Sequence, residues 1–214
     1  MSKFKRIVLD FGHGGLDRNG KYTTDPKIGK LHRFPNGDVA YEGVINRWLG
    51  EAIVNELRKQ LPELERVMTV HYTDPTDLPL DKRVAKANNF NPEETFFISI
   101  HCNAANTKAR GFEIYTTKGQ TISDVLGECI ANEVEILYKQ LGLTFRKDLS
   151  DGDKDKEANF YVLQKTRCAA VLLETLFFDN EEDYKILRNP IFQEKFATAV
   201  VKGVKTFVEN SSKI

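Results

Sequence analysis

The sequence predicts an α/β fold, a single domain built on a mostly parallel, twisted sheet of about six strands flanked by helices. The first observation is the uncharged run at residues 95–100, which is typical of a strand buried on both faces and follows turn residues at 91–94. Apolar runs at 4–10 and 169–176 have the same character. The second observation is that amphipathic helical segments separate these runs, and strands that alternate with helices indicate an α/β sheet.

Composition indicates a globular chain with one substantial core. The 214 residues are 41% hydrophobic and 29% charged, which suits one domain over residues 1–214 and is short for two. Lysine plus arginine equals aspartate plus glutamate at 31 each, so we expect no nucleic-acid partner. The three cysteines lack CxxC spacing, so neither a disulfide framework nor a thiolate zinc site is predicted.

The start of the chain bears on where the protein acts. It is basic, but only three apolar residues, 7–9, follow before Asp10, so no signal-peptide core is predicted. No stretch approaches the length of a transmembrane helix. We therefore expect synthesis in a cytoplasm and another route for any action outside it.

Hydrophobic periodicity places the individual elements along the chain. Residues 16–39 are polar and punctuated by Gly, Pro and Asn, so they are predicted to be neither helix nor strand, and loops of this length are usually functional or mobile. Strands are predicted at 4–10, 67–72, 95–100, 111–117, 160–163 and 170–174, and helices at 44–61, 80–90, 123–141, 181–187 and 192–208. Gly142 is a suitable C-terminal cap for the third helix.

The acidic and basic run at 147–157 raises the question of a calcium loop. Its aspartates lack the DxDxDG register and closing glutamate of an EF-hand, and no suitable helix pair flanks them. We interpret this run as a solvated loop.

Two histidines stand where predicted strands end. His101 follows the 95–100 strand directly, and His13 follows the first strand between glycines that leave its imidazole unshielded. The carboxyl edge of an α/β sheet is where catalytic groups collect. A single histidine at a strand end is more often an ordinary polar residue, and this is the only interpretation that His32 and His71 support.

Two glutamates extend this pattern. Glu42 stands at the start of a predicted helix, where the helix dipole favours a carboxylate whatever its function, so structural and ligand roles are both open. Glu174 follows a buried strand, where a carboxylate is costly without a partner. Two histidines and one carboxylate are the ligand count of a catalytic zinc ion, and Glu174 is left for proton transfer. The HExxH signature is absent, so distant segments must assemble such a site.

Four segments, in order, carry a family pattern. They are DFGHGGLD at 10–17, Glu42 with Asn46 and the helix that follows, SIHCNA at 99–104 and VLLETLFFDN at 171–180. Together they resemble the zinc-dependent N-acetylmuramoyl-L-alanine amidases of the type-3 amidase group. A weaker pattern of Leu80, Arg83 and Asn88 extends the resemblance over nearly the whole chain.

The resemblance implies a set of residue roles and a substrate. His13, Glu42 and His101 would bind Zn²⁺, Glu174 would be the catalytic general base and acid, and Asn103 would bind substrate. The implied reaction is hydrolysis of the amide between N-acetylmuramic acid and L-alanine in peptidoglycan or muropeptides. We expect a monomeric lysis enzyme such as a phage endolysin, released by a holin-type route, although a bacterial remodelling amidase would show the same motifs.

The chain departs from the family pattern at several positions. Phe11 and Ala169 replace the usual prolines and Cys102 replaces the usual alanine, and none of these changes removes a functional group. The segment 16–41 is longer than the usual connection. Both its ends adjoin expected ligands, so we expect it to form a wall of the substrate groove. Side chains of this segment that could contact sugar or peptide are Tyr22, His32, Arg33 and Phe34.

Two other functions compete with this hypothesis. A thiol hydrolase could use Cys102 or Cys168 with His101, but adjacent side chains in a strand diverge and Cys168 lacks an activating motif. A catalytically inactive wall-binding or regulatory module would have lost functional residues, whereas all four expected residues are present.

Overall fold

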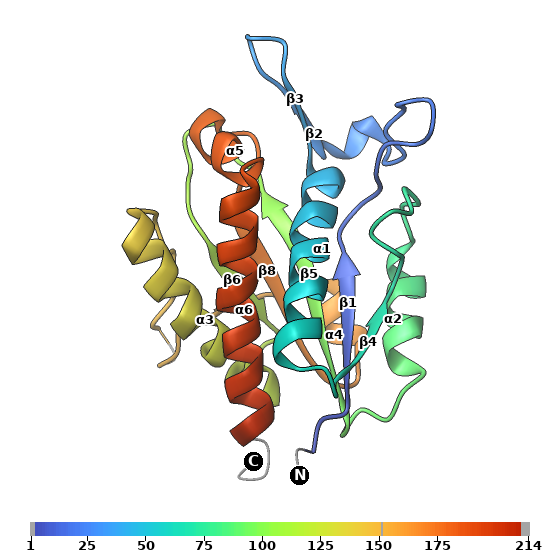
Figure 1. Cartoon of the computed structure of the whole chain (residues 1–214), viewed down its shortest axis with the longest axis vertical. Helices are drawn as coiled ribbons and strands as arrows, with labels where there is room; N and C mark the ends of the chain where they lie inside the picture. Colours follow the sequence, from blue (N-terminus) through green and yellow to red (C-terminus); the bar gives the residue numbers. More distant parts are fainter. Residues whose placement is uncertain (1–2, 151, 211–214) are drawn as a thin grey trace.

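The computed structural model describes residues 3–150 and 152–210, and its centre is a six-stranded sheet in the order β4-β1-β5-β8-β6-β7 (Figure 1). The strands are β1 (Arg6–Phe11), β4 (Glu65–Met68), β5 (Thr95–Asn103), β6 (Glu113–Thr116), β7 (Lys156–Glu157) and β8 (Ala169–Phe177). The first four in spatial order are parallel, and β6 runs antiparallel to β8. The predicted mostly parallel sheet of about six strands is confirmed.

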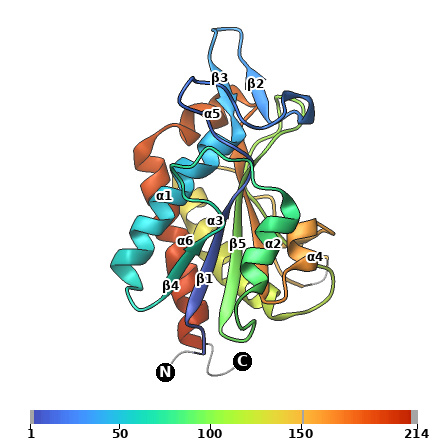
Figure 2. The ribbon, with the colours of Figure 1, turned by 90° about the vertical axis from the view of Figure 1, so that its right-hand side faces the viewer.

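Helices cover both faces of the sheet (Figure 2). One face carries α1 (Glu42–Gln60), α3 (Ile122–Leu141) and α6 (Pro190–Asn210), the other carries α2 (Leu80–Asn88) and α4 (Tyr161–Lys165), and α5 (Glu181–Leu187) follows β8. The larger hydrophobic cluster lies under the three long helices, and a smaller one lies under α2 and α4. No helix in the described ranges is both long and apolar enough to cross a membrane.

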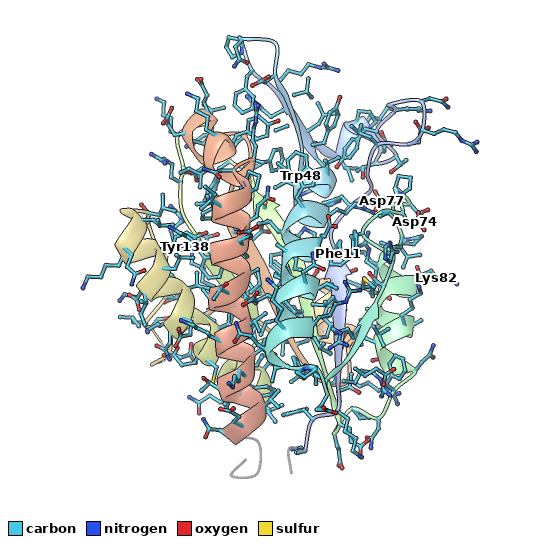
Figure 3. The ribbon with its side chains drawn as sticks, in the orientation of Figure 1. Phe11, Trp48, Asp74, Asp77, Lys82 and Tyr138 are labelled. Carbon is cyan, nitrogen blue, oxygen red and sulfur yellow. The ribbon has the colours of Figure 1, made fainter. Side chains whose placement is uncertain are left out.

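The core beneath the long helices is packed closely. Phe11 and Tyr138, both labelled in Figure 3, are fully buried, and the Tyr138 hydroxyl donates to the Thr175 carbonyl at 2.5 Å. A Cβ added at Gly203 of α6 would lie 2.5 Å from the Ile130 Cα of α3. Only glycine allows α3 and α6 to approach this closely.

The segment between β1 and α1 is more regular than the sequence predicts. It contains a 3-10 turn, η1 (Pro26–Ile28), and a hairpin of β2 (Leu31–Arg33) and β3 (Val39–Tyr41). Gly37 turns the hairpin with a φ of 92°. The hairpin packs on α5, because Phe34 stacks on Tyr184 with ring centroids 5.0 Å apart. The prediction of neither helix nor strand is therefore wrong, since tertiary packing stabilises strands too short to show periodicity.

Three other predictions differ from the structure. Residues 160–163 are not a strand, because α4 buries Val162 and Leu163 while Phe160 and Tyr161 stay exposed; a four-residue apolar run cannot separate these alternatives. The strand predicted at 67–72 ends at Met68. In the run 147–157, predicted as a solvated loop, residues 156–157 form β7 and Asp155 is buried, while Asp151 lies outside the described residues.

Candidate metal centre

His13 is presented by a tightly held turn at the carboxyl end of β1. Its backbone φ of 64° is in the left-handed region, which is uncommon for a residue with a side chain. Two residues of α1 hold the turn: Asn46 Nδ2 donates to the Gly12 carbonyl at 3.0 Å and Arg47 Nη1 donates to the His13 carbonyl at 2.8 Å. These bonds fix where the imidazole points.

A second set of bonds holds the turn from the other side. The Gly14 amide donates to Thr24 Oγ1 at 2.6 Å, and Thr24 Oγ1 donates to Asp77 Oδ2 at 2.8 Å. Asp77 in turn pairs with Arg83 of α2 at 3.1 Å. The insertion and α2 thus both support the position of His13.

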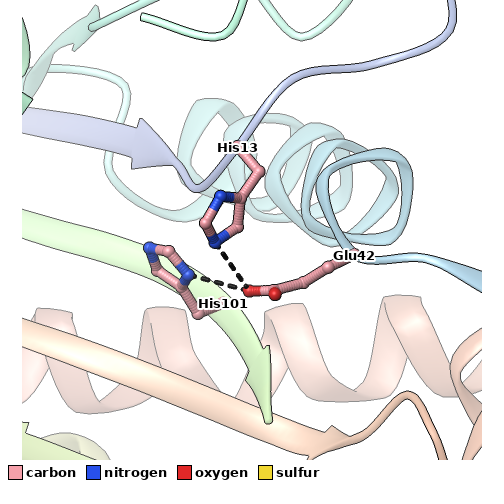
Figure 4. Close-up of side chains that lie close together, drawn as sticks. All are labelled: His13, Glu42 and His101. Carbon is pink, nitrogen blue, oxygen red and sulfur yellow. Dashed lines mark hydrogen bonds and ion pairs between the residues drawn. The ribbon is translucent and has the colours of Figure 1, made fainter. Parts of the chain in front are cut away.

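Glu42 is the point at which the candidate ligands meet (Figure 4). It is the first residue of α1 and is fully buried. Its Oε1 lies 2.9 Å from His101 Nδ1 and 3.4 Å from His13 Nε2. The two imidazole ring centroids are 5.1 Å apart with an interplanar angle of 88°, and the rings approach the same carboxylate from the turn after β1 and from β5. Lys30 Nζ approaches the other oxygen, Oε2, at 3.1 Å.

The electrostatics of Glu42 and His101 favour the forms that bind metals. Burial acts to raise the pKa of Glu42, but hydrogen bonds to His101 and His13 outweigh it and hold that pKa well below its usual range. Burial lowers the pKa of His101 despite the nearby carboxylate. An ionised glutamate and a neutral imidazole are the protonation states that metal ligation requires.

Glu174 lies beside this group, on the neighbouring strand. It pairs with His101 in the register of β5 and β8, so it lies within β8 and not after its end. Burial and the negative charge of Glu42 raise the pKa of Glu174 well above its ordinary value. Its Oε2 is buried and has no hydrogen-bond partner among the described residues. A carboxyl group in this environment retains a proton readily.

The donor set fits a metal ion. One ligand atom from each of His13, Glu42 and His101 lies within 4.8 Å of the others. Among the described residues, His13 Nε2 and Glu42 Oε2 are buried and form no hydrogen bond of good geometry. Their polar neighbours are Glu42 Oε1, 3.4 Å from His13 Nε2, and Lys30 Nζ, 3.1 Å from Glu42 Oε2. Two imidazole nitrogens and one carboxylate could therefore hold a metal with a coordination position left open.

Comparison with known proteins agrees with this geometry. The sequence profile of the N-acetylmuramoyl-L-alanine amidases matches residues 7–206. The chain belongs to the type-3 family of N-acetylmuramoyl-L-alanine amidases. Four motifs in order could identify this family from the sequence because they carry the residues that meet at Glu42.

Individual relatives cover nearly the whole of this amidase-family chain. It is 28% identical over 208 residues to the uncharacterized protein YqiI of Bacillus subtilis, covering 96% of this chain and 85% of that one. It is 27% identical to the endolysin of Bacillus phage SPP1, covering 94% of this chain but 65% of that protein. The solved catalytic domain of CwlV, an amidase from Bacillus (Paenibacillus) polymyxa, is 27% identical with a TM-score of 0.71, covering 96% and 99% of the two chains.

A cleft of about 510 Å³ opens beside the candidate ligands in this member of the amidase family. His13, His101 and Glu174 lie in its wall. The insertion contributes Ile28 and Lys30 to this wall, while the expectation that residues 16–41 form a wall of the substrate groove stays a prediction. Apolar side chains from α2, α4 and the residue before α4 complete the wall: Leu80, Phe160, Tyr161 and Val162.

The side chains expected to contact substrate from the insertion do not line this cleft. Tyr22 is buried, and its hydroxyl accepts a hydrogen bond from the Gly43 amide at 3.0 Å. Phe34 is buried against α5. His32 packs edge-on against Phe34 with ring centroids 4.6 Å apart. These residues hold the insertion in place, and the sequence gives no signal that separates them from Ile28 and Lys30.

Asn103 is engaged in a different set of bonds. Its Nδ2 donates to Glu113 Oε2 at 2.7 Å, and its Oδ1 accepts from the Ala104 amide at 2.9 Å. It is not among the residues that line the cleft. Its contact with substrate stays a prediction.

A buried ionic network around Asp10 lies next to the candidate ligands, and the sequence did not predict it. Asp10 accepts hydrogen bonds from Thr69 at 2.6 Å, Ser99 at 2.7 Å and Arg83 at 2.8 Å. Burial alone would raise the pKa of Asp10, but Arg83 and the two hydroxyls hold it below its usual value. The available signal was a carboxylate at the end of an apolar run, the same signal that indicated Glu174.

Proposed function

We propose that this protein is a zinc-dependent amidase that cleaves the bond between N-acetylmuramic acid and L-alanine in bacterial peptidoglycan. The observation that carries the proposal is the convergence of His13, His101 and buried Glu42 on one point, with Glu174 beside them. In this proposal the first three hold Zn²⁺ through His13 Nε2, His101 Nδ1 and the Glu42 carboxylate, and Glu174 transfers protons.

The roles follow from the chemistry of amide hydrolysis. When bound, zinc polarises the scissile carbonyl and lowers the pKa of a coordinated water. Glu174 accepts a proton from the attacking water and delivers it to the departing amine of L-alanine as the carbon–nitrogen bond breaks. The raised pKa of Glu174 suits both steps, because a carboxyl group that holds a proton near neutral pH can also donate it.

Family membership and the relatives support the substrate and the setting. An endolysin among the relatives supports wall lysis after release from the cell as the biological role. The motifs extend from residue 10 to residue 180, which supports residues 1–214 as one catalytic domain, and in this proposal that domain acts as a monomer.

A cysteine-dependent hydrolase fits the structure poorly. Burial raises the pKa of Cys102 well above its ordinary value, and burial raises the pKa of Cys168 to about 12. A thiol nucleophile needs the opposite shift, since the thiolate is the reactive form.

The proposal is tested by separating metal binding from proton transfer. We expect the purified protein to contain about one zinc per chain and to release L-alanine-terminated stem peptides from peptidoglycan, measured by metal analysis and mass spectrometry. Glu174→Gln should lower turnover on the order of 10²-fold or more while zinc stays bound, because the amide keeps the shape but accepts no proton.

Variants at the ligands should behave differently. His13→Ala, His101→Ala and Glu42→Gln should lose zinc and activity together. Full activity after verified zinc removal would refute zinc dependence, and digestion products cut at another bond would refute the substrate assignment. Zinc-replete protein that binds peptidoglycan but cuts no bond would support an inactive binding module instead.

A further inference from the structure

Three aspartates meet at the opposite edge of the sheet from β4, beside α3. Asp124 belongs to the first turn of α3, while Asp153 and Asp155 precede β7. One carboxylate oxygen from each lies within 4.8 Å of the others. Asp124 also accepts a hydrogen bond from the Thr121 backbone amide, which fixes the aspartate in the capping box of the helix.

Asp155 is the buried member of this group. It is 1% exposed, and its Oδ2 accepts a hydrogen bond from the Thr116 hydroxyl. Its Oδ1 is buried and receives no hydrogen bond from any described residue. Asp155 Oδ1 packs against Gly127 of α3, and a Cβ added at Gly127 would lie 3.3 Å from this oxygen. A carboxylate oxygen has thus been buried without a donor.

Several other buried carboxylates of this chain have cationic partners, whereas buried Asp179 accepts hydrogen bonds from the Ala105 and Thr107 backbone amides instead. Asp10 pairs with Arg83, Glu113 pairs with Arg146 and Lys156, and Asp183 pairs with Arg110. Across the described residues, Asp155 forms no such ion pair, and the nearest lysines in sequence are engaged elsewhere. Lys154 pairs with Glu135 at 2.8 Å, and Lys156 pairs with Glu113 at 2.7 Å.

The neighbours of Asp155 increase the need for positive charge. The Asp153 carboxylate lies within hydrogen-bonding reach, and two ionised acceptors repel at that distance. Burial, followed by the effects of Asp153 and Asp124, raises the pKa of Asp155 to about 7. Either a proton or a cation must therefore compensate the negative charge of the three aspartates.

We propose that Asp124, Asp153 and Asp155 form a binding site for a hard divalent cation of the calcium class. Three carboxylates offer only oxygen ligands. Calcium and magnesium prefer oxygen, whereas zinc also binds nitrogen and sulfur ligands. Calcium also tolerates an irregular site completed by water, which suits a group formed by one helix and one loop. The site is distinct from the His13, Glu42 and His101 group and needs none of those residues.

A cation here would act on the cleft through the chain that follows it. Asp155 leads into β7, which pairs with β6, and the Ala158 amide donates to the Thr116 carbonyl at 3.0 Å. Phe160 and Tyr161 in the cleft wall come next along the chain. The bound cation would tie residues 153–155 to α3 and thereby stabilise the segment that carries this wall.

The test uses the zinc-loaded protein with CaCl₂ as the probe and MgCl₂ for comparison. We expect calorimetry to show about one calcium bound per chain beyond zinc, and we expect the unfolding temperature to rise with calcium concentration, because the ligand binds only the folded state. Asp155→Asn and Asp153→Asn should abolish both effects. Asp81→Asn, which removes an exposed carboxylate from α2, is the matched control and should respond as the wild type does.

Two outcomes would overturn the proposal. In the first, the wild-type protein neither binds calcium at millimolar concentration nor gains stability from it, and Asp155→Asn is at least as stable as the wild type. A shared proton would then compensate the negative charge of the aspartates. The other is calcium binding that Asp155→Asn and Asp153→Asn both retain. Asp153→Asn keeps the test decisive if Asp155→Asn does not fold. His13→Ala should still bind calcium, which separates this site from the zinc proposal.

Discussion

Glu174 and Asp10 are two carboxyl groups of the same sheet whose surroundings act in opposite directions. Glu174 lies beside another negative charge without a hydrogen-bond partner for one oxygen among the described residues, so its ionisation is disfavoured. Asp10 is also buried, but Arg83 and two hydroxyls stabilise its charge. The first arrangement lowers stability and would serve proton transfer in the proposed mechanism. The second holds together the elements that carry the candidate ligands.

This contrast gives a pH-dependent prediction for the metal-free protein. At a pH below about 4.3, the unfolded-state value, folded and unfolded Glu174 are both protonated. As pH rises, the unfolded chain loses the proton first, so the folded state is increasingly destabilised up to its own, raised pKa. We expect Glu174→Gln to have the larger free energy of unfolding at pH 7, by about 1.4 kcal/mol for each tenfold change in proton affinity, and no advantage near pH 4.

Urea unfolding with a chelator present, from pH 4 to pH 8, measures this difference. Asp10→Asn is the control, because it should change the free energy of unfolding at pH 7 in the opposite direction. Its lowered pKa contributes stability above about pH 4, so the variant should lose about 3 kcal/mol at pH 7, because Arg83 is left buried without its partner. A Glu174→Gln variant that is less stable than the wild type at every pH would contradict our account of this residue.

At the scale of elements, the insertion combines two kinds of residue. Its hairpin is anchored on α5 by Phe34, and by Tyr184, whose hydroxyl donates to the Val39 carbonyl at 3.1 Å. The turn before the hairpin places Ile28 at the cleft with 53% of its surface exposed. Leu80 of α2 is equally exposed at the same cleft. The anchoring and the cleft-lining functions can therefore be separated by point substitutions.

We expect Ile28→Ser to leave stability within about 0.5 kcal/mol of the wild type, because the side chain is exposed. Its kcat/KM on muropeptides should fall about three- to tenfold, as loss of one apolar contact predicts. Phe34→Ala is the matched control and should lose about 3 kcal/mol of stability through its buried contact. Unchanged kinetics for Ile28→Ser on muropeptides and on intact wall would exclude a substrate contact by this residue.

The same elements show what the sequence could predict. Apolar runs located the central strands, because burial on both faces leaves a local signal. Motifs singled out His13, Glu42, His101 and Glu174, which the fold brings together, while their roles stay predictions. The hairpin and α4 were missed, because such short elements depend on packing against α5 and α2. The apolar cleft wall has no local signal either, since its residues come from separate segments that only the fold brings together.

At the scale of the molecule, the helical layer of α1, α3 and α6 stabilises the sheet without contributing to the cleft wall. Gly203 allows α6 to contact the Ile130 backbone of α3. We expect Gly203→Ala to lower the free energy of unfolding by about 1–3 kcal/mol through overpacking, and the unfolding temperature by several degrees. Thr206→Ala, on the exposed side of α6, should stay within about 0.5 kcal/mol of the wild type.

Calorimetry of both variants, with zinc analysis of the folded protein, checks this expectation. Zinc content per folded chain should not change, because the candidate ligands come from the turn after β1, the start of α1 and β5, and not from α3 or α6. A fully stable Gly203→Ala variant would show that the two helices can separate without loss of packing.

The stacking of Phe4 on Phe207, with ring centroids 4.6 Å apart, joins the start of β1 to the end of α6. Figure 1 shows both at the end of the molecule away from the insertion. An affinity tag, a fluorescent protein or a wall-targeting module attached at either terminus would therefore project away from the cleft. For engineering, a surface-immobilised form coupled through either end would leave the cleft exposed to the solution.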